Sequence, residues 1–242
     1  MNDDTQPVKR WGYWATLGWA ILAYGLGQVA ATVLVIAWEG GDLSTLMTTP
    51  YDGKLVALSV LALNPITVAV LLIAVRLAKA NPVDYLALVV PRARQVMPAI
   101  LCLIGLIAAS DLALYLSGSA LITPFQSQSY TTATAEGWLP VLWIAAVIVA
   151  PAGEELLFRG FIFRGIVRPG RTAWLGIVGT AVLFALPHVQ YDLIGMAQIF
   201  VVGLFLGWAR LTWGSVLMTF LLHALFNLEG MMETVLAIKF FS

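Results

Sequence analysis

The chain has 242 residues, of which 60% are hydrophobic and only 11% charged, and its formal net charge is zero. A soluble domain carries roughly 45–50% apolar and about 25% charged residues, so lipid must solvate much of this surface. The balanced charge argues against a nucleic-acid partner, and the single cysteine, Cys102, excludes an intrachain disulfide framework. We therefore expect an integral membrane protein with no room for a separate soluble domain.

Apolar runs long enough to span a bilayer, which takes about 20 residues, follow one another along the chain. They cover residues 14–36, 55–75, 96–117, 138–158, 173–190, 193–211 and 214–237. The first run is too long for a signal peptide and has no convincing small-residue cleavage site. The sequence predicts an all-α polytopic fold of about seven transmembrane helices.

Lysine and arginine placement predicts the orientation of these helices. With a cytoplasmic N-terminus, all basic residues except Lys54 and Lys239 fall on or near the cytoplasmic side. The opposite orientation would reverse this ratio. We therefore expect a cytoplasmic N-terminus, and the compact form without long loops favours a prokaryotic plasma membrane.

Ionisable residues within the apolar runs are candidates for function, because burying them in a membrane is costly. Glu154 and Glu155 lie in the segment Pro-Ala-Gly-Glu-Glu-Leu-Leu-Phe-Arg-Gly, which ends with Arg159 and Gly160. Glu155 and Arg159 are four residues apart and can pair on one helical face. Glu154 points about 100° away from Glu155 and can face a different cavity. We interpret the Glu155–Arg159 pair as structural and Glu154 as chemical.

The two histidines of the chain are further candidates. His188 ends the segment Phe-Ala-Leu-Pro-His, and His223 begins His-Ala-Leu-Phe-Asn, which ends with Asn227. The four-residue spacing lets His223 and Asn227 reach one point, and His188 on a neighbouring helix could complete the site.

Two kinds of chemistry remain open for this set. A desolvated Glu154 is a competent general base for water, and an imidazole and a carboxamide could stabilise an oxyanion. Alternatively, Glu154, His188 and His223 could hold a zinc ion with an open position. Each motif alone has an ordinary explanation, such as a salt bridge at a helix end or a helix–helix hydrogen bond. The combination in consecutive membrane segments favours a catalytic site.

These motifs resemble those of the CAAX-protease and bacteriocin-processing family of intramembrane peptidases, also called the type II CAAX prenyl endopeptidase or Abi family. The family pattern is Glu-Glu-x-x-x-Arg, then Phe-x-x-x-His, then His-x-x-x-Asn. This sequence supplies the pattern over about residues 138–237, and the spans before it match no motif of the family. The residues are Glu154, Glu155, Arg159, Phe184, His188, His223 and Asn227.

The resemblance implies that Glu154 and His188 activate water and that His223 and Asn227 stabilise the oxyanion. Glu155, Arg159 and Phe184 would support them. It further implies cleavage near the terminus of a membrane-associated or lipid-linked protein or peptide, without selecting a substrate. A divalent metal such as zinc is left open. We accordingly divide the chain into N-terminal spans (residues 1–137) and a catalytic core (residues 138–242).

Two other functions remain as alternatives. A non-catalytic membrane protein of this fold could bind and inhibit another protein, as an immunity protein or a regulatory partner does. A transporter could use a protonatable glutamate near the midplane, although no inverted repeat is evident. The pattern His-Glu-x-x-His of zincin-type proteases is absent.

Secondary expectations concern the remaining polar residues of the spans. Asp111 is expected to be solvated near a span end, Glu229 and Glu233 to share one face, and Gln198 to bond across helices. The predicted boundaries also create a conflict, because they separate Glu154 and His188 in depth by about 10–15 Å. Either the helix that carries His188 begins deeper, or Pro151 or Pro187 bends a helix, or one boundary is wrong.

Overall fold

The computed structural model describes residues 10–41, 51–168, 170 and 172–241, and this part of the chain is helical without strands. Six stretches are long and apolar enough to cross a membrane. They are α1 (Tyr13–Trp38), α3 (Gly53–Leu77), α5 (Ala93–Ser117), the composite stretch Leu139–Ile166, α11 (Leu193–Trp213) and α12 (Val216–Phe241). We call Leu139–Ile166 the central helix. The all-α membrane fold of about seven helices is confirmed.

One expected span is too long. Residues 173–190 were predicted to cross the membrane, but α10 covers only Ala173–Ala185 and ends before His188. At 1.5 Å per residue its 13 residues reach about 20 Å, too little to cross a hydrocarbon core of about 30 Å. Pro187 contributes to the stop, because it has no amide proton with which to continue the helical hydrogen bonds.

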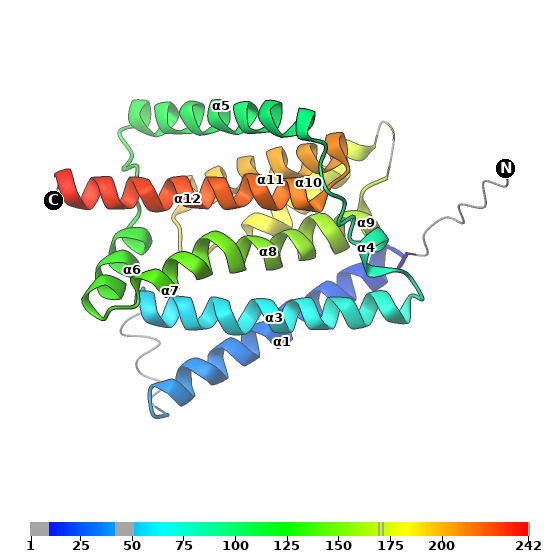
Figure 1. Cartoon of the computed structure of the whole chain (residues 1–242), viewed down its shortest axis with the longest axis horizontal. Helices are drawn as coiled ribbons and strands as arrows, with labels where there is room; N and C mark the ends of the chain where they lie inside the picture. The colour runs from blue at the N-terminus through cyan, green and yellow to red at the C-terminus, as the bar shows by residue number, and fades with distance from the viewer. Residues whose placement is uncertain (1–9, 42–50, 169, 171, 242) are drawn as a thin grey trace.

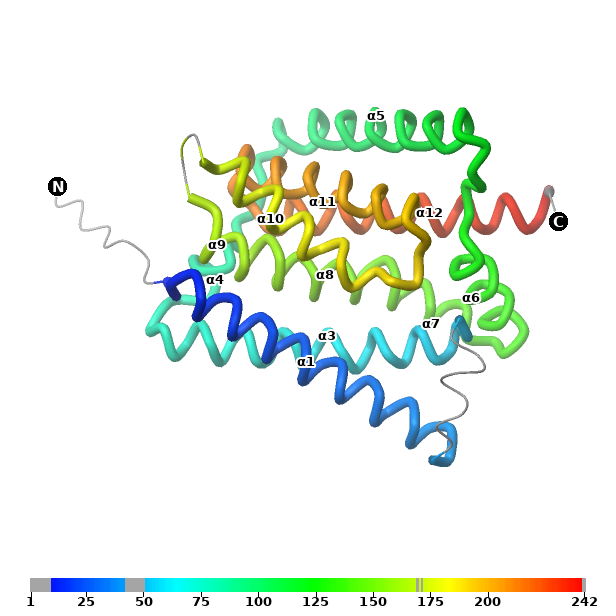
Figure 2. The backbone as a smooth tube through the Cα atoms, turned by 180° about the vertical axis from the view of Figure 1, so that it is seen from behind, coloured from blue at the N-terminus to red at the C-terminus, as the bar shows by residue number. Residues whose placement is uncertain are grey.

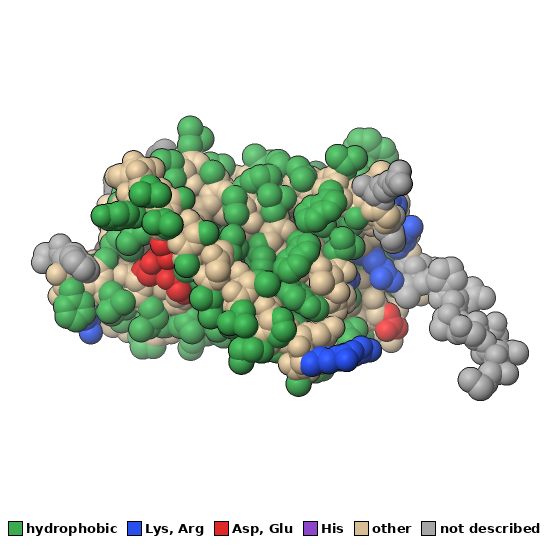
Figure 3. Space-filling view, turned by 90° about the horizontal axis from the view of Figure 1, so that it is seen from above, with side chains coloured by type: hydrophobic (Ala, Val, Ile, Leu, Met, Phe, Trp, Pro, Cys, Tyr) green, Lys and Arg blue, Asp and Glu red, His purple; other side chains and the backbone are tan. Residues whose placement is uncertain are grey.

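The long helices lie side by side along one axis of the molecule (Figures 1 and 2). α5 forms one edge, α1 and α3 form the opposite edge, and the central helix lies between them. Hydrophobic side chains cover much of the face seen in Figure 3, while Lys and Arg gather mostly toward its right-hand end. This distribution suits a body solvated by lipid around its middle.

Two apolar cores lie between the edges of the bundle, and the first includes the central helix. On one side, Phe158 and Phe161 pack with Ala20 of α1 and Leu71 of α3. On the other side of the molecule, a second core joins α5, α11 and α12. Its buried members are Ala99, Leu103, Val202, Leu206, Ala209, Met218 and Leu222. The first core therefore packs the second half of the central helix against α1 and α3.

The segment 118–137 was expected to be a linker, yet it contains the helix α6 (Pro124–Ala135). Thr123 Oγ1 accepts a hydrogen bond from the Gln126 backbone amide, and the Gln126 side-chain oxygen accepts one from the Thr123 backbone amide. This reciprocal cap with a proline at the first helical position is a helix start that the Thr-Pro-Phe-Gln sequence encodes. α6 is tied to the start of α3, where the Gly53 amide donates to Thr132 Oγ1 over 2.8 Å.

Gly153, the residue before Glu154, lets α3 approach the central helix. A Cβ placed on Gly153 would lie 1.9 Å from Oδ1 and 2.6 Å from Cγ of the buried Asn64. The side chain of Asn64 also donates to the Val60 carbonyl over 3.0 Å, which limits how far it can move. Glycine at position 153 therefore allows the part of the central helix next to Glu154 to pack closely against α3.

We predict that Gly153→Ala lowers the midpoint of thermal unfolding in detergent, because overpacking a close helix contact costs about 1–3 kcal/mol. Gly105→Ala on α5 is the matched control, since a Cβ at Gly105 meets nothing within 4 Å. Circular dichroism of the two purified variants measures the difference. Equal midpoints would show that the α3 contact is not tight.

Candidate active site

The central helix changes its hydrogen-bonding pattern on both sides of Glu154. It runs as α7 (Leu139–Ile144), a π-helical turn at Ala145–Val149, α8 (Ala150–Glu155), a second π-helical stretch at Leu156–Ile162, and α9 (Phe163–Ile166). Pro151 has no amide to donate and its ring crowds the carbonyl four residues before it, which explains the first π turn. Such π segments recur at functional sites because they re-aim side chains.

Side-chain donors from two other helices bind carbonyls inside these π stretches. Asn227 of α12 donates from Nδ2 to the Ala146 carbonyl over 2.8 Å, and Arg210 of α11 donates from Nε to the Arg159 carbonyl over 3.1 Å. A buried carbonyl outside the regular helical ladder needs such a partner. The two bonds fasten α11 and α12 to the central helix on either side of Glu154.

The predicted Glu155–Arg159 ion pair is confirmed. Arg159 Nη1 lies 2.7 Å from Glu155 Oε1, and both side chains are buried. Arg159 Nη2 also donates to the Gly203 carbonyl of α11 over 3.1 Å, and its guanidinium carbon lies 4.3 Å from the ring centre of Phe184. The pair thus joins the central helix to α10 and α11.

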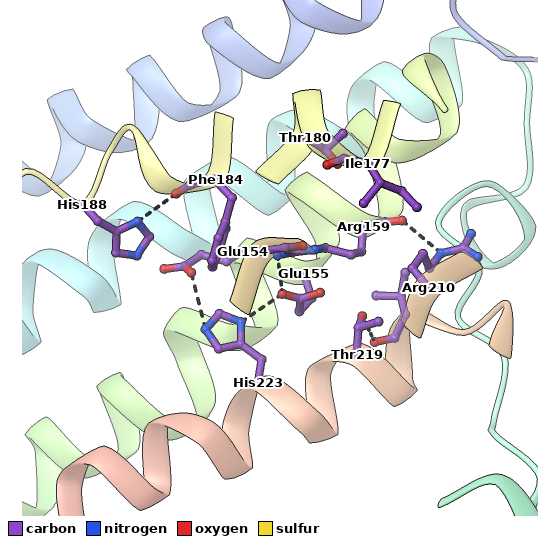
Figure 4. A network of polar contacts seen from close by, with 12 residues as sticks. Glu154, Glu155, Arg159, Ile177, Thr180, Phe184, His188, Arg210, Thr219 and His223 are labelled. Atoms are coloured by element: carbon purple, nitrogen blue, oxygen red, sulfur yellow. Dashed lines mark hydrogen bonds and ion pairs between the residues drawn. The ribbon is translucent and has the colours of Figure 1, made fainter. Parts of the chain in front are cut away.

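Glu155 also binds His223, which the sequence did not indicate. His223 Nδ1 lies 2.9 Å from Glu155 Oε1, and a carboxylate paired with an arginine can only accept this bond. Nδ1 of His223 therefore carries a proton, and Nε2 faces Glu154 Oε2 at 3.8 Å (Figure 4). Glu155 is consequently a support for the histidine as well as the partner of Arg159.

His188 follows the end of α10 and reaches the depth of Glu154. Its Nδ1 lies 2.8 Å from the Phe184 carbonyl, so Nδ1 donates and Nε2 keeps its lone pair. Figure 4 shows the Glu154 carboxylate between the two imidazole rings. The expected conflict in depth came from a wrong boundary, because the stretch 138–158 placed Glu154 near its end, whereas the central helix continues to Ile166.

Tyr191 and Phe125 belong to the same surroundings, although the sequence analysis missed both. Tyr191 stacks on His188 at 6.3 Å between ring centres, and Phe125 of α6 contacts Tyr191 edge-on at 5.5 Å. Burial raises the pKa of the Tyr191 phenol to about 12, and the charge of Glu154 adds to the shift. Tyr191 therefore stays protonated near neutral pH and can only serve as a hydrogen-bonding alcohol. The Thr-Pro-Phe-Gln segment, which predicts a helix start, is the sequence signal that could have drawn attention to Phe125.

A cavity of about 560 Å³ brings the predicted residues together. Glu154, His188, His223 and Asn227 all line it, and so does Phe184. The same cavity has apolar walls from α11 and α12, including Ile199, Val202 and Phe226. The chemistry that such a set can perform is proton transfer and hydrogen bonding at one end of an apolar pocket.

The residues proposed as metal ligands do not form a compact ligand set in this arrangement. Among the described residues, the ligand atoms that lie within 4.8 Å of one another belong to Asp111, Glu229 and Glu233, and not to Glu154, His188 and His223. A zinc ion held by three of these side chains does not fit here.

The secondary expectations have mixed outcomes. Gln198 does bond across helices, donating to Ser110 Oγ on α5 over 2.9 Å. Glu229 and Glu233 share a face, as their spacing predicted, and both line the large cavity. Asp111 is partly buried beside them, where simple solvation near a span end had been expected.

Comparison with known proteins places the same segment in a recognised group. Residues 136–228 match the sequence model described as type II CAAX prenyl endopeptidase Rce1-like. All three motifs fall within the match, so the resemblance indicated by the motifs is confirmed, and this part of the chain is similar to the Rce1-like endopeptidases.

One similar curated protein is described as uncharacterized. An uncharacterized 24.3 kDa protein of Escherichia coli is 37% identical over 128 residues, which make up 50% of this chain and 58% of that protein. The chain therefore aligns with little more than half of its length. No solved structure matches the chain.

We predict that Glu155→Gln lowers the stability of the protein by about 3–5 kcal/mol, because it leaves the Arg159 guanidinium buried without a countercharge. The matched control is Glu136→Gln, whose pair with Lys54 at 2.9 Å is partly exposed and worth about 0.2–1 kcal/mol. Thermal unfolding in the same detergent compares the variants. Similar shifts for both would contradict a supporting role for Glu155.

Proposed function

We propose that this protein is an intramembrane endopeptidase that uses Glu154 as its base. The observation that carries the proposal is the position of Glu154 between two imidazoles in a cavity inside the helical bundle. Support also comes from the Rce1-like match, which includes every residue of the set. The substrate class is a peptide bond near the terminus of a membrane-associated or lipid-linked protein or peptide.

In this mechanism Glu154 removes a proton from water, and the water oxygen attacks the carbonyl carbon of the peptide bond. His188 accepts a second hydrogen bond from the same water through the Nε2 lone pair and so orients it. Glu154 then returns the proton to the leaving nitrogen as the carbon–nitrogen bond breaks. The products are one carboxyl group and one amine, and general acid–base catalysis of this kind contributes about 10²–10⁴-fold.

His223 and Asn227 would stabilise the negative oxygen that forms on the attacked carbonyl. His223 can donate from Nε2 when its ring carries both protons, while its Nδ1 proton is bound to Glu155. Asn227 uses one Nδ2 proton on the Ala146 carbonyl and keeps a second for the substrate. One such donor contributes about 3–4 kcal/mol in well-studied sites.

We place the site in the plasma membrane of a prokaryote with the N-terminus in the cytoplasm. The start of α1 shares its end of the bundle with the end of the central helix and the start of α12. Arg10, Arg164, Arg168 and Arg210 lie in the sequence at or near this end. Their gathering there supports a cytoplasmic N-terminus by the positive-inside rule.

We predict that Glu154→Gln abolishes cleavage while leaving the fold intact, because the amide cannot take up a proton. The measurement is mass spectrometry of protein and peptide termini from membranes of cells that express the parent protein or the variant. Glu136→Gln is the control and should give the parental pattern. Termini that appear with the parent and disappear with Glu154→Gln would reveal the substrate as well.

Identical termini in both samples, with equal amounts of folded protein, would overturn the catalytic assignment. The non-catalytic alternative would then be favoured, in which the same cavity binds a partner without cleaving it.

A further inference from the structure

A second cavity lies against the central helix on the side of α1 and α3. Its volume is about 310 Å³. Glu154 and His188 line both cavities, whereas His223 and Asn227 line the larger and are absent from the walls of the smaller. The proposed base therefore stands at the boundary between two spaces, with the proposed oxyanion donors on one side of it.

The wall of the smaller cavity is mostly apolar, but α1 and α3 contribute several polar side chains to it. Tyr24 and Gln28, four residues apart on α1, face it together with Ser59 of α3. None of these three side chains makes a hydrogen bond to any residue that the structure describes, although each sits within a membrane-spanning helix. Polar groups at this depth normally pair with protein or line a space that contains water.

Asn64 and Thr67 extend the polar strip along α3. Thr67 donates to the Ala23 carbonyl of α1 over 3.4 Å, beside the close contact that Gly27 permits between the two helices. Asn64 lies against Gly153, next to Glu154. The strip thus leads along α1 and α3 to the carboxylate.

A hydrolase with its base at this depth must receive water from somewhere. Glu154 lies 15 residues after Leu139 and 12 before Ile166, so either end of the central helix is about 20 Å away. The hydrocarbon core holds no water to supply it. A substrate seated against His223 and Asn227 would occupy the larger cavity and block access from that side.

We propose that the smaller cavity is a water reservoir that supplies Glu154 from the side opposite to the substrate. Its volume has room for about ten water molecules at roughly 30 Å³ each. Tyr24, Gln28 and Ser59 satisfy their hydrogen bonds with this water. The use of the water in catalysis rests on the proposed function, whereas the presence of water in the cavity does not.

Cysteine accessibility tests the cavity without any assay of cleavage. Cys102, the single cysteine of the chain, is first replaced by Cys102→Ser. Gln28→Cys and Ser59→Cys then place a thiol on the cavity wall, and Val29→Cys places one at the same depth on the exposed surface of α1. A charged methanethiosulfonate reagent is added to protein in lipid bilayers, and intact-mass spectrometry counts the modified molecules.

We expect Gln28→Cys and Ser59→Cys to be modified and Val29→Cys to stay unreacted, because a thiol ionises and reacts in water but not in hydrocarbon. Both cavity positions unreacted in folded protein would overturn the reservoir. Equal modification of Val29→Cys would overturn it too, since reactivity would then not follow the cavity.

A second arm separates the reservoir from the proposed function. Gln28→Leu combined with Ser59→Val removes polar groups from the wall, and we expect kcat to fall by roughly tenfold with KM unchanged. Parental kcat in this variant would overturn the supply role. Labelling as expected without any cleavage by the parent protein would instead overturn the peptidase while leaving the wet cavity in place.

Discussion

The buried carboxylate of Glu155 holds the site together, because three elements depend on it at once. It carries the charge that allows Arg159 to be buried, and Arg159 in turn binds α11 through the Gly203 carbonyl. The same oxygen fixes His223 of α12. A buried ion pair contributes little net stability, but removing one partner is costly. Glu155 therefore specifies how the helices meet, and the position of Nε2 of His223 follows from that.

The irregular central helix explains how two adjacent glutamates can serve different purposes. Glu155 points into the buried network, while Glu154 reaches the cavities on the other side. The π stretches before and after them are held by Asn227 and Arg210, so the orientation of this short α-helical piece is set by α11 and α12. In this arrangement, Asn227 donates one amide proton to the Ala146 carbonyl and can donate the other to a substrate.

Much of this could be predicted from the sequence, because the membrane reduces the choice to helices and makes buried charges conspicuous. The four candidate residues line one cavity as expected. The length of α10 was missed, since apolar residues continue past its end and hydropathy cannot tell a helix from an apolar turn. The bond from His223 to Glu155 was missed because it joins residues 68 apart, a pairing that only helix packing decides.

The protonation of His223 tests the account most directly, and the chain has only one other histidine, His188. Nitrogen NMR of protein labelled with ¹⁵N-histidine in lipid bilayers can resolve both rings. The account predicts that Nδ1 of His223 carries the proton bound to Glu155, and that Glu155→Gln changes this signal. A His223 ring with a bare Nδ1 and a protonated Nε2 would contradict the network on which the proposed site depends.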